Sequence, residues 1–309
     1  MSMIIVSTGK NLSRWVDALK NTDPGLEVFL PDEVKDKSSI RFALAWNHPH
    51  GMFRDFPNLQ CVSSFGAGVD HILSDPHLPE QVKVVRIIDP LLSADMAEFA
   101  LAVVLSNMRR LPEFWKLKQE KTWKKRSYKR LDETRVGIMG TGVIGHHVAN
   151  ELQRIGLRVS GWSRTTGNQG VYTKYHGQDQ LPNFLKKLDY LICLLPLTPQ
   201  TVGIIDEKLM EHLPAGSFLI NLGRGAHLKD HDLIKMINRG HISGAHLDVF
   251  DPEPLPADHP FWSHPAIQIT PHVASLTDPE SVAPQVVSNY WRLMENKVLL
   301  NTVSRPLGY

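Results

Sequence analysis

The chain has 309 residues, 42% hydrophobic and 21% charged, which is typical of a globular protein large enough for two domains. A formal net charge of +2 gives no global attraction to nucleic acid or membranes, and polar residues interrupt the apolar runs before they reach bilayer length. The start, M-S-M-I-I-V-S, reads as a strand instead of a signal peptide, and Cys61 and Cys193 in apolar runs indicate buried thiols in a reducing cytoplasm.

The N-terminal part of the chain alternates between short apolar runs and polar stretches. A helix is predicted near residues 12–20. Strands are predicted at residues 3–6, 26–30, 41–46, 59–64 and 82–88. This β/α alternation predicts a small parallel sheet.

Residues 93–110 predict a helix that is apolar on nearly all of its faces. Asp95 and Glu98 have the spacing of a capping box and indicate where it begins. A helix without a polar face must be buried, so it suits a connector between two domains.

A basic stretch follows at residues 116–130, with eight Lys or Arg against Glu120 alone. A nucleic-acid contact is one interpretation. A solvated face is favoured, because local runs of charge are common, and a weaker alternative is a field that attracts small anionic substrates.

The stretch 135–145, R-V-G-I-M-G-T-G-V-I-G, predicts a strand, a tight turn and a helix that begins directly after the last glycine. Gly140 allows the turn, Gly142 lets backbone N–H groups approach a pyrophosphate, and Gly145 allows close packing of helix on strand. Val143 and Ile144 complete this fingerprint. The positive end of the helix dipole then faces the phosphates.

Alternation of strands and helices resumes after the fingerprint. Amphipathic helical segments include residues 230–239 and 278–296. Strands are predicted at residues 157–162, 190–195, 217–222, 242–249 and 266–270. This order predicts an α/β fold with a doubly wound parallel sheet.

The end of the second strand indicates which nucleotide is accepted. An NAD-specific site places an acid there, whereas this chain has Ser163, Arg164 and Thr165. A guanidinium can bind a 2′-phosphate that a carboxylate would repel, so the sequence predicts NADP(H). The alternative is a surface arginine on an ordinary loop.

Three later segments place polar groups at or just beyond strand ends: N-L-G-R-G with Arg224, L-D-V-F-D-P-E-P-L-P with Asp248 and Glu253, and T-P-H-V-A with His272. Each alone could be a turn, a solvated loop or a structural histidine. Together they could supply a fork for a carboxylate, a proton donor for a ketone and an acid that keeps the donor charged.

These motifs, with F-G-A-G-V-D at 65–70 and C-L-L-P-L-T-P-Q-T at 193–201, make the chain resemble the D-isomer-specific 2-hydroxyacid dehydrogenases. The W-S-R-T, I-T-P-H-V-A and terminal G-Y are most similar to the bacterial glyoxylate/hydroxypyruvate reductase A type. The resemblance implies a Rossmann-type nucleotide domain, residues 95–277, inserted in a smaller flavodoxin-like substrate-binding domain, residues 1–94 and 278–309.

The resemblance also implies roles for individual residues. Arg224 would grip the substrate carboxylate, His272 would protonate the alkoxide, and Glu253 would stabilise the imidazolium. Asp248 would face the nicotinamide carboxamide. Further contacts are implied for Pro196 and Thr201 with the cofactor, and for the backbone of Ala67, Gly68 and Val69 with the substrate; Trp46 would line the pocket or merely pack.

The activity expected from this resemblance is NADPH-dependent reduction of glyoxylate and hydroxypyruvate to glycolate and D-glycerate, with NAD(H) used more weakly. Two alternatives are a reductase of a bulkier or phosphorylated 2-keto acid, and a nucleotide-sensing co-regulator without catalysis. We expect a cytoplasmic homodimer that acts on a small anionic substrate, without a metal ion, a nucleic-acid partner or a membrane.

Overall fold

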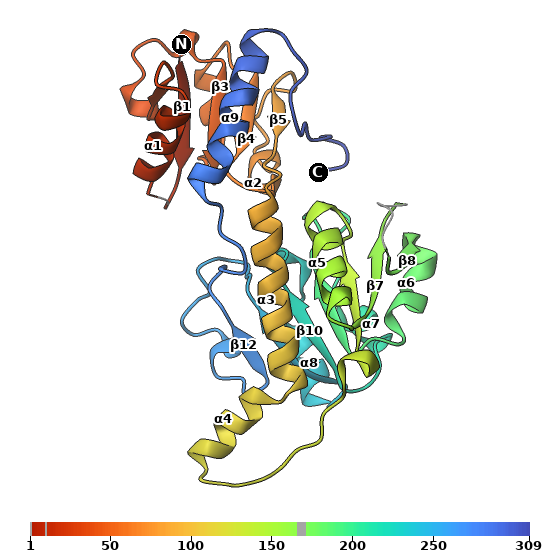
Figure 1. The fold of residues 1–309 in the computed structure, drawn as a ribbon. Helices are drawn as coiled ribbons and strands as arrows, with labels where there is room; N and C mark the ends of the chain where they lie inside the picture. The colour runs from red at the N-terminus through yellow and green to blue at the C-terminus, as the bar shows by residue number, and fades with distance from the viewer. Residues whose placement is uncertain (1, 10, 166–170) are drawn as a thin grey trace. The chain divides into compact units, whose positions relative to one another are not determined.

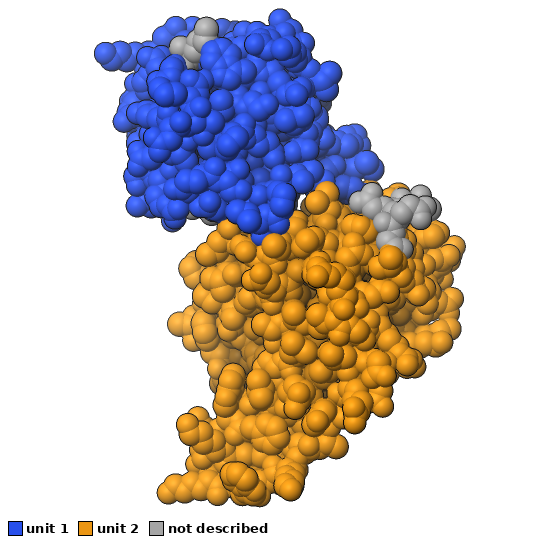
Figure 2. Space-filling model, in the orientation of Figure 1, with its two compact units in different colours: residues 1–91, 277–309 blue, residues 92–276 orange. Residues whose placement is uncertain are grey.

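The computed structural model describes residues 2–9, 11–165 and 171–309 and contains two parallel sheets flanked by helices (Figure 1). It divides into unit 1, residues 1–91 and 277–309, and unit 2, residues 92–276 (Figure 2). The boundary between them falls in the first turn of helix α3 (Pro90–Met108). That unit 1 binds the substrate and unit 2 the nucleotide stays a prediction at this point.

Unit 1 is built on a five-stranded sheet in the order β2-β1-β3-β4-β5, with every pair parallel. This is the flavodoxin-like order. Its strands are β1 (Ser2–Ser7), β2 (Glu27–Phe29), β3 (Phe42–Trp46), β4 (Cys61–Ser64) and β5 (Lys83–Val85). Its helices are α1 (Ser13–Thr22), α2 (Asp70–Leu73) and α9 (Pro279–Met294).

The C-terminal segment of the chain completes unit 1. Helix α9 packs against α1 (Figure 1), and the Trp291 indole donates a hydrogen bond to Asp23 at 2.7 Å. The backbone of Val303 donates to Val84 of β5 at 2.8 Å. Unit 1 is therefore made from both ends of the sequence.

Helix α3 begins earlier than the capping-box spacing predicts. Pro90 occupies the first helical position, and the Asp89 side chain accepts a hydrogen bond from the Leu91 N–H at 3.2 Å. Proline is favoured at this position because its missing N–H needs no partner there. The interpretation of Asp95 and Glu98 as the helix start is therefore wrong.

Helix α3 is long and apolar enough, by length and composition alone, to cross a membrane, which the sequence reading did not anticipate. Six of its eight buried residues, from Met96 to Met108, belong to a core of unit 2 that includes residues of β6 and β9. Only 39% of its apolar window is buried, and Leu91 is 53% exposed, so the burial predicted for a helix without a polar face is confirmed only in part.

Unit 2 has a seven-stranded parallel sheet in the order β12-β11-β10-β9-β6-β7-β8. Numbered within the unit, this is the Rossmann order with an added seventh strand, and its order reverses between β6 and β9. The strands are β6 (Arg135–Met139), β7 (Arg158–Ser163), β8 (Thr173–His176), β9 (Tyr190–Cys193), β10 (Ser217–Asn221), β11 (Ile242–Leu247) and β12 (Ile267–Ile269). The flanking helices include α5 (Val143–Arg154), α6 (Gly177–Leu185), α7 (Glu207–Glu211) and α8 (Asp230–Asn238).

The predicted α/β class, with a doubly wound sheet in a nucleotide-type domain and a flavodoxin-like sheet beside it in the chain, is confirmed. Helix α5 begins at Val143, inside the glycine fingerprint, instead of after it. Strand β8 and helix α6 were not predicted as separate elements, because their segment is polar and short.

The basic stretch is partly helical. Helix α4 (Leu111–Gln119) includes its start, and Figure 1 shows α4 and the segment after it extending from the rest of unit 2. Arg126 pairs with Glu113 and Lys129 with Asp189, so part of the charge is neutralised within the chain. No observation tests the nucleic-acid alternative.

Candidate active site

The predicted site residues of unit 2 follow the carboxyl ends of its strands. Because all strands of the sheet are parallel, the segments after β6, β7, β9, β10, β11 and β12 begin at one edge. Ligands of doubly wound sheets bind at this edge, next to the point where the strand order reverses.

The fingerprint glycines have different steric surroundings. Gly140 has φ +101°, and a Cβ there would lie 2.6 Å from the Leu194 carbonyl oxygen, at the end of β9. A Cβ on Gly145 would lie 1.8 Å from the Gly140 oxygen. A Cβ on Gly142 would meet nothing within 4 Å, so the space beside it, at the N-terminus of α5, is open. Open space at a helix N-terminus, where N–H groups lack intrahelical partners, fits a bound pyrophosphate.

The segment after β7 carries the residues expected to choose the nucleotide. The Ser163 hydroxyl donates to the Thr165 carbonyl at 2.6 Å, which closes a tight turn around Arg164. Arg164 and Thr165 are exposed. No carboxylate stands at these three positions, so the predicted 2′-phosphate contact is chemically possible.

The loop after β9 is held by Thr201. Its hydroxyl donates to the Pro196 carbonyl at 2.8 Å and accepts from the Thr198 N–H at 2.8 Å. His227, fully buried, lies with Nε2 3.3 Å from the same carbonyl. These bonds order the loop whose contact with the cofactor is predicted.

Arg224 follows β10 and precedes a short 3-10 turn, η5 (Gly225–His227). Its backbone N–H donates to His227 Nδ1 at 3.1 Å, and the Asn221 amide donates to its carbonyl at 2.9 Å. Its guanidinium donates to the Gly223 carbonyl at 2.8 Å. Backbone and side chain are therefore both positioned by neighbouring residues.

The second glycine of N-L-G-R-G, Gly225, is required because there is no room for a side chain. A Cβ at this position would lie 2.0 Å from the Phe250 carbonyl carbon. The backbone after Arg224 therefore packs directly on the segment that leads to Glu253.

His272 and Glu253 form the pair that the sequence predicts. His272 Nδ1 lies 2.8 Å from Glu253 Oε2, and the Phe250 N–H donates to Glu253 Oε1 at 3.0 Å. Burial opposes ionisation of Glu253, but the hydrogen bonds from His272 and Phe250 and the positive charges of His272 and Arg224 outweigh it and lower its pKa. Glu253 is therefore ionised at neutral pH and can stabilise a charged imidazole.

The backbone of His272 has φ +54°, a left-handed conformation that costs a non-glycine residue on the order of 1–3 kcal/mol. Its N–H donates to the Asp248 carbonyl at 2.8 Å. The Asp248 carboxylate accepts hydrogen bonds from the N–H groups of Val273 and Ala274, both at 2.9 Å, and from the Thr270 hydroxyl. Asp248 is 1% exposed and thus holds the turn that carries His272; its predicted contact with the cofactor stays a prediction.

Sequence reasoning missed the residues that support this site. His227, Asn221 and Thr270 act through hydrogen bonds to the motif residues. Asn221 and Thr270 stand inside the quoted motifs, so motif membership was an available signal. His227 had none beyond its position three residues after Arg224.

In unit 1 the predicted substrate-binding residues are Trp46, the last residue of β3, and the loop after β4. The Ser64 hydroxyl donates to the Gly68 carbonyl at 2.7 Å and accepts from the Gly66 N–H at 3.1 Å, so it shapes the loop of Ala67 and Val69. The ring of Trp46 packs on that of His71 with centroids 4.4 Å apart. Within unit 1, these residues lie at the carboxyl edge of the sheet.

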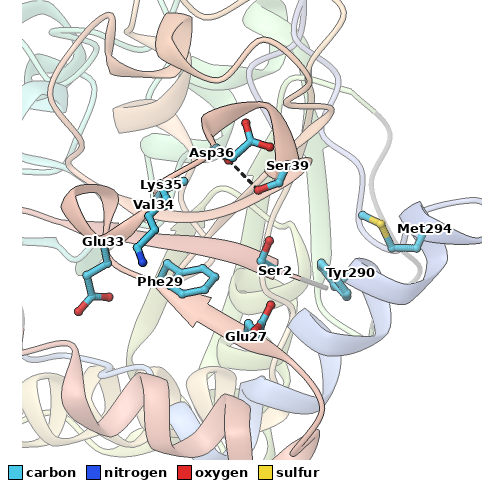
Figure 3. Close-up of a pocket in the computed structure, with 10 residues that line it drawn as sticks. All are labelled: Ser2, Glu27, Phe29, Glu33, Val34, Lys35, Asp36, Ser39, Tyr290 and Met294. Carbon is cyan, nitrogen blue, oxygen red and sulfur yellow. Dashed lines mark hydrogen bonds between the residues drawn. The ribbon is translucent and has the colours of Figure 1, made fainter.

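A cavity of about 590 Å³ lies elsewhere in unit 1. Figure 3 shows it among β2, α9 and the segment after β2, with Glu27, Phe29, Glu33 and Tyr290 in its lining. It is at the amino edge of the sheet, near Ser2, and contains none of the predicted site residues. Among the residues that the structure describes, no group of three or more His, Cys, Asp or Glu is arranged to hold a metal ion.

The sequence of the chain is similar to those of known proteins. The sequence model of the NAD binding domain of D-isomer specific 2-hydroxyacid dehydrogenases matches residues 101–274. A glyoxylate/hydroxypyruvate reductase A of Yersinia enterocolitica is 40% identical over 279 residues, 89% of each chain. One of Serratia proteamaculans is 36% identical over 100% of each chain.

Solved structures are similar over the full length. A D-isomer specific 2-hydroxyacid dehydrogenase of Xanthobacter autotrophicus Py2, solved with NADPH and MES, has a TM-score of 0.95 at 38% identity, covering 100% of this chain and 99% of that one. An NADPH-dependent glyoxylate/hydroxypyruvate reductase of Sinorhizobium meliloti, solved with NADP and sulfate, has a TM-score of 0.93 at 33% identity, with the same coverage. The chain therefore belongs to the D-isomer-specific 2-hydroxyacid dehydrogenases, the family that its motifs predict.

Proposed function

We propose that the chain reduces glyoxylate and hydroxypyruvate to glycolate and D-glycerate with NADPH, and uses NADH more weakly. The observation that carries the proposal is the contact of His272 with ionised Glu253, in the same unit as Arg224 and the nucleotide fingerprint. The named activity of the relatives supports these substrates, and the NADPH and NADP bound to similar structures support the cofactor.

The reaction adds a hydride to the carbonyl carbon next to the carboxylate and a proton to its oxygen; when bound, the nicotinamide supplies the hydride. His272 supplies the proton. Its Nδ1 is held by Glu253 at 2.8 Å, so Nε2 is the nitrogen that delivers the proton. Glu253 favours the charged ring before transfer and orients it.

Arg224 binds the substrate carboxylate with its guanidinium fork and draws charge from the adjacent carbonyl group. In unit 1, the proposal assigns further substrate contacts to the backbone of Ala67, Gly68 and Val69 and to the ring of Trp46. A small 2-keto acid can contact Arg224 and His272 at once, because its carboxylate and its reactive carbonyl group are adjacent.

The cofactor contacts in the proposal follow the fingerprint. Gly142, Val143 and Ile144 at the start of α5 bind the pyrophosphate, and Ser163, Arg164 and Thr165 bind the 2′-phosphate. The same proposal gives Pro196, Thr201 and Asp248 contacts with the remainder of the cofactor.

The test is a steady-state assay of NADPH and NADH oxidation with a panel of 2-keto acids. The proposal expects the highest kcat/KM with glyoxylate or hydroxypyruvate and NADPH. A higher kcat/KM with a bulkier or phosphorylated keto acid would identify that acid as the substrate instead. Tight NADPH binding without turnover of any keto acid would favour a nucleotide-sensing co-regulator without catalysis.

The proposal includes a cytoplasmic homodimer. Cys61 and Cys193 are buried free thiols, and burial raises the pKa of the Cys193 thiol to about 12, so neither is prone to oxidation.

Trp115 and Trp123, on and after α4, are 64% and 97% exposed. Exposed tryptophans on an extended segment suit a contact with a second copy.

A further inference from the structure

A chain of buried polar groups leads from β11 to the turn that carries His272. His246, 6% exposed, lies with Nδ1 3.3 Å from the Gln268 Oε1 and Nε2 3.1 Å from the Thr270 Oγ1. The Thr270 hydroxyl lies 2.6 Å from the Asp248 Oδ1 and donates to it. Three successive contacts thus join Gln268, His246, Thr270 and Asp248.

The orientation of the Gln268 amide is fixed from α3. The Gln268 Nε2 donates to the Asn107 Oδ1 at 2.8 Å, and the Asn107 Nδ2 donates to the Val103 carbonyl at 2.9 Å. A backbone carbonyl can only accept, so Asn107 cannot be turned over, and Gln268 cannot be turned over without placing two oxygens in contact. The Gln268 oxygen therefore faces His246 as an acceptor.

The three contacts need more hydrogens than the neutral ring, the hydroxyl and the ionised carboxylate supply. Each of the three contacts needs one hydrogen. A neutral imidazole has one N–H, the threonine hydroxyl has one hydrogen and an ionised carboxylate has none. This supplies two hydrogens for three contacts, so one contact would place two lone pairs opposite each other in a buried site.

We propose that His246, Thr270 and Asp248 hold one proton more than a neutral imidazole, a hydroxyl and a carboxylate would, at neutral pH. With this proton on the ring, Nδ1–H donates to Gln268, Nε2–H donates to Thr270, and Thr270 donates to the Asp248 carboxylate. All three contacts are then satisfied, and the buried charges of His246 and Asp248 cancel.

The surroundings of His246 contain few other charges. Asp248 is the charged group whose field reaches it from its own strand. The residues packed on it from α3 and β12 are neutral, namely Phe99 and Gln268. Burial lowers the pKa of His246 by more than the Gln268 hydrogen bond and the Asp248 charge raise it. The proposal therefore rests on the three contacts, which need three hydrogens, and not on the pKa of the ring alone.

The function of this arrangement rests on the proposed activity of His272. Asp248 binds the Val273 and Ala274 N–H groups and, through its carbonyl, the His272 N–H. If the extra proton is lost, a ring with its hydrogen on Nε2 still donates to Thr270 but leaves the Gln268 contact without a hydrogen, whereas a ring with its hydrogen on Nδ1 leaves Thr270 to donate to either His246 or Asp248. His246 and Thr270 are thus positioning residues for the general acid.

The protonation state is measured on the resting enzyme with NADPH bound, by 15N NMR of histidine-labelled protein at about pH 7.5, one pH unit above the ordinary histidine pKa. The signal of His246, one of 15 histidines, is identified by its absence in His246→Gln. We expect a doubly protonated ring, or a protonated Asp248 carboxyl by 13C NMR. A singly protonated ring together with an ionised Asp248 would overturn the proposal, whatever the substrate of the enzyme.

The link itself is tested with Thr270→Val, which keeps the side-chain shape and removes the hydroxyl. We expect His246 to lose its extra proton at the same pH, and kcat to fall about tenfold, while the Kd for NADPH changes less than about twofold. Thr134→Val is the matched control, because Thr134 is fully buried in the same unit and its hydroxyl donates to the Arg130 carbonyl at 2.8 Å. An unchanged His246 signal in Thr270→Val would refute the role of Thr270.

Discussion

The carboxyl group of Glu253 decides how activity responds to pH. Its pKa in the folded protein is lowered, because the bonds and charges of His272, Phe250 and Arg224 outweigh the effect of burial. A group with a lowered folded pKa stabilises the fold above its unfolded pKa, and this contribution disappears as the pH falls through the folded value. The ionised carboxylate that His272 requires is therefore retained below the ordinary glutamate range.

Replacing Glu253 with Gln tests this at the residue level. We expect kcat at neutral pH to fall about tenfold or more, because a neutral amide stabilises the imidazolium less well. Profiles of kcat/KM against pH should show an acidic limb below the ordinary glutamate range in the wild type that is absent in Glu253→Gln. Glu211→Gln, an exposed residue of α7, is the control; equal kcat in the two variants would contradict the role of Glu253.

Arg164 is the residue on which the choice of nucleotide depends. In Arg164→Asp, a carboxylate replaces the guanidinium that we propose binds the 2′-phosphate. The ratio of kcat/KM for NADPH over NADH should fall about 10- to 100-fold, the value of a lost charge-assisted contact. Arg158→Asp makes the same change at the other end of β7 and should leave the ratio unchanged. If Arg164→Asp behaves like this control, the 2′-phosphate is bound elsewhere.

At the scale of elements, the β6–α5 connection contains one glycine that packing requires, Gly145, and one that nucleotide binding is proposed to require, Gly142. Gly145→Ala would place a Cβ 1.8 Å from the Gly140 oxygen, whereas Gly142→Ala meets nothing within 4 Å. We expect Gly145→Ala to lower the free energy of unfolding by about 1–3 kcal/mol through overpacking. Gly142→Ala should keep its Tm and weaken NADPH binding about tenfold by filling the space beside the phosphates. Calorimetry and NADPH titration of both variants are the measurements; the reverse assignment of the two effects would be inconsistent with the fingerprint.

The elements differ in how well their sequence predicts them. Strands such as β6 and β9 were predicted because buried parallel strands are continuous apolar runs. The start of α3 was not, because Asp89 and Pro90 give a helix signal as good as the one at Asp95, and only the structure shows which one is used. Strand β8 lacks an apolar run, since it lies at the sheet edge beside β7 alone.

In the candidate site, too, some residues were predictable from the sequence and others were not. Arg224, Glu253 and His272 were predicted from motifs, since each follows a strand of recognisable pattern. Of the residues that orient them, Asn221 and Thr270 stand inside the same motifs, but their hydrogen-bond partners could not be predicted, because these are set by tertiary contact: His246 meets Thr270 across 24 residues, and Asn107 meets Gln268 across 161. A single sequence contains no period or spacing that predicts such hydrogen bonds.

At the scale of the whole molecule, each unit has its own doubly wound sheet and its own predicted ligand contacts. The nucleotide residues all belong to unit 2, and the loop of Ala67, Gly68 and Val69 belongs to unit 1. The activity that we propose requires contributions from both.

The proposed homodimer gives a prediction at this scale. Trp115→Ala combined with Trp123→Ala removes two exposed rings, and truncation of aromatic interface residues is often costly. We expect the dimer dissociation constant to rise about tenfold or more in sedimentation experiments. Trp262→Ala, 56% exposed, is the control. A wild-type protein that sediments as a monomer would contradict the homodimer.

The most direct test of the central claim is the steady-state kcat of His272→Ala with NADPH and glyoxylate, measured together with the Kd for NADPH. If His272 protonates the carbonyl oxygen of the substrate, kcat falls about 10²- to 10⁴-fold, as for the loss of a general acid, while the Kd stays within about twofold of wild type. His212→Ala, next to α7, should match the wild type in both. A His272→Ala enzyme with near-normal kcat would contradict the account.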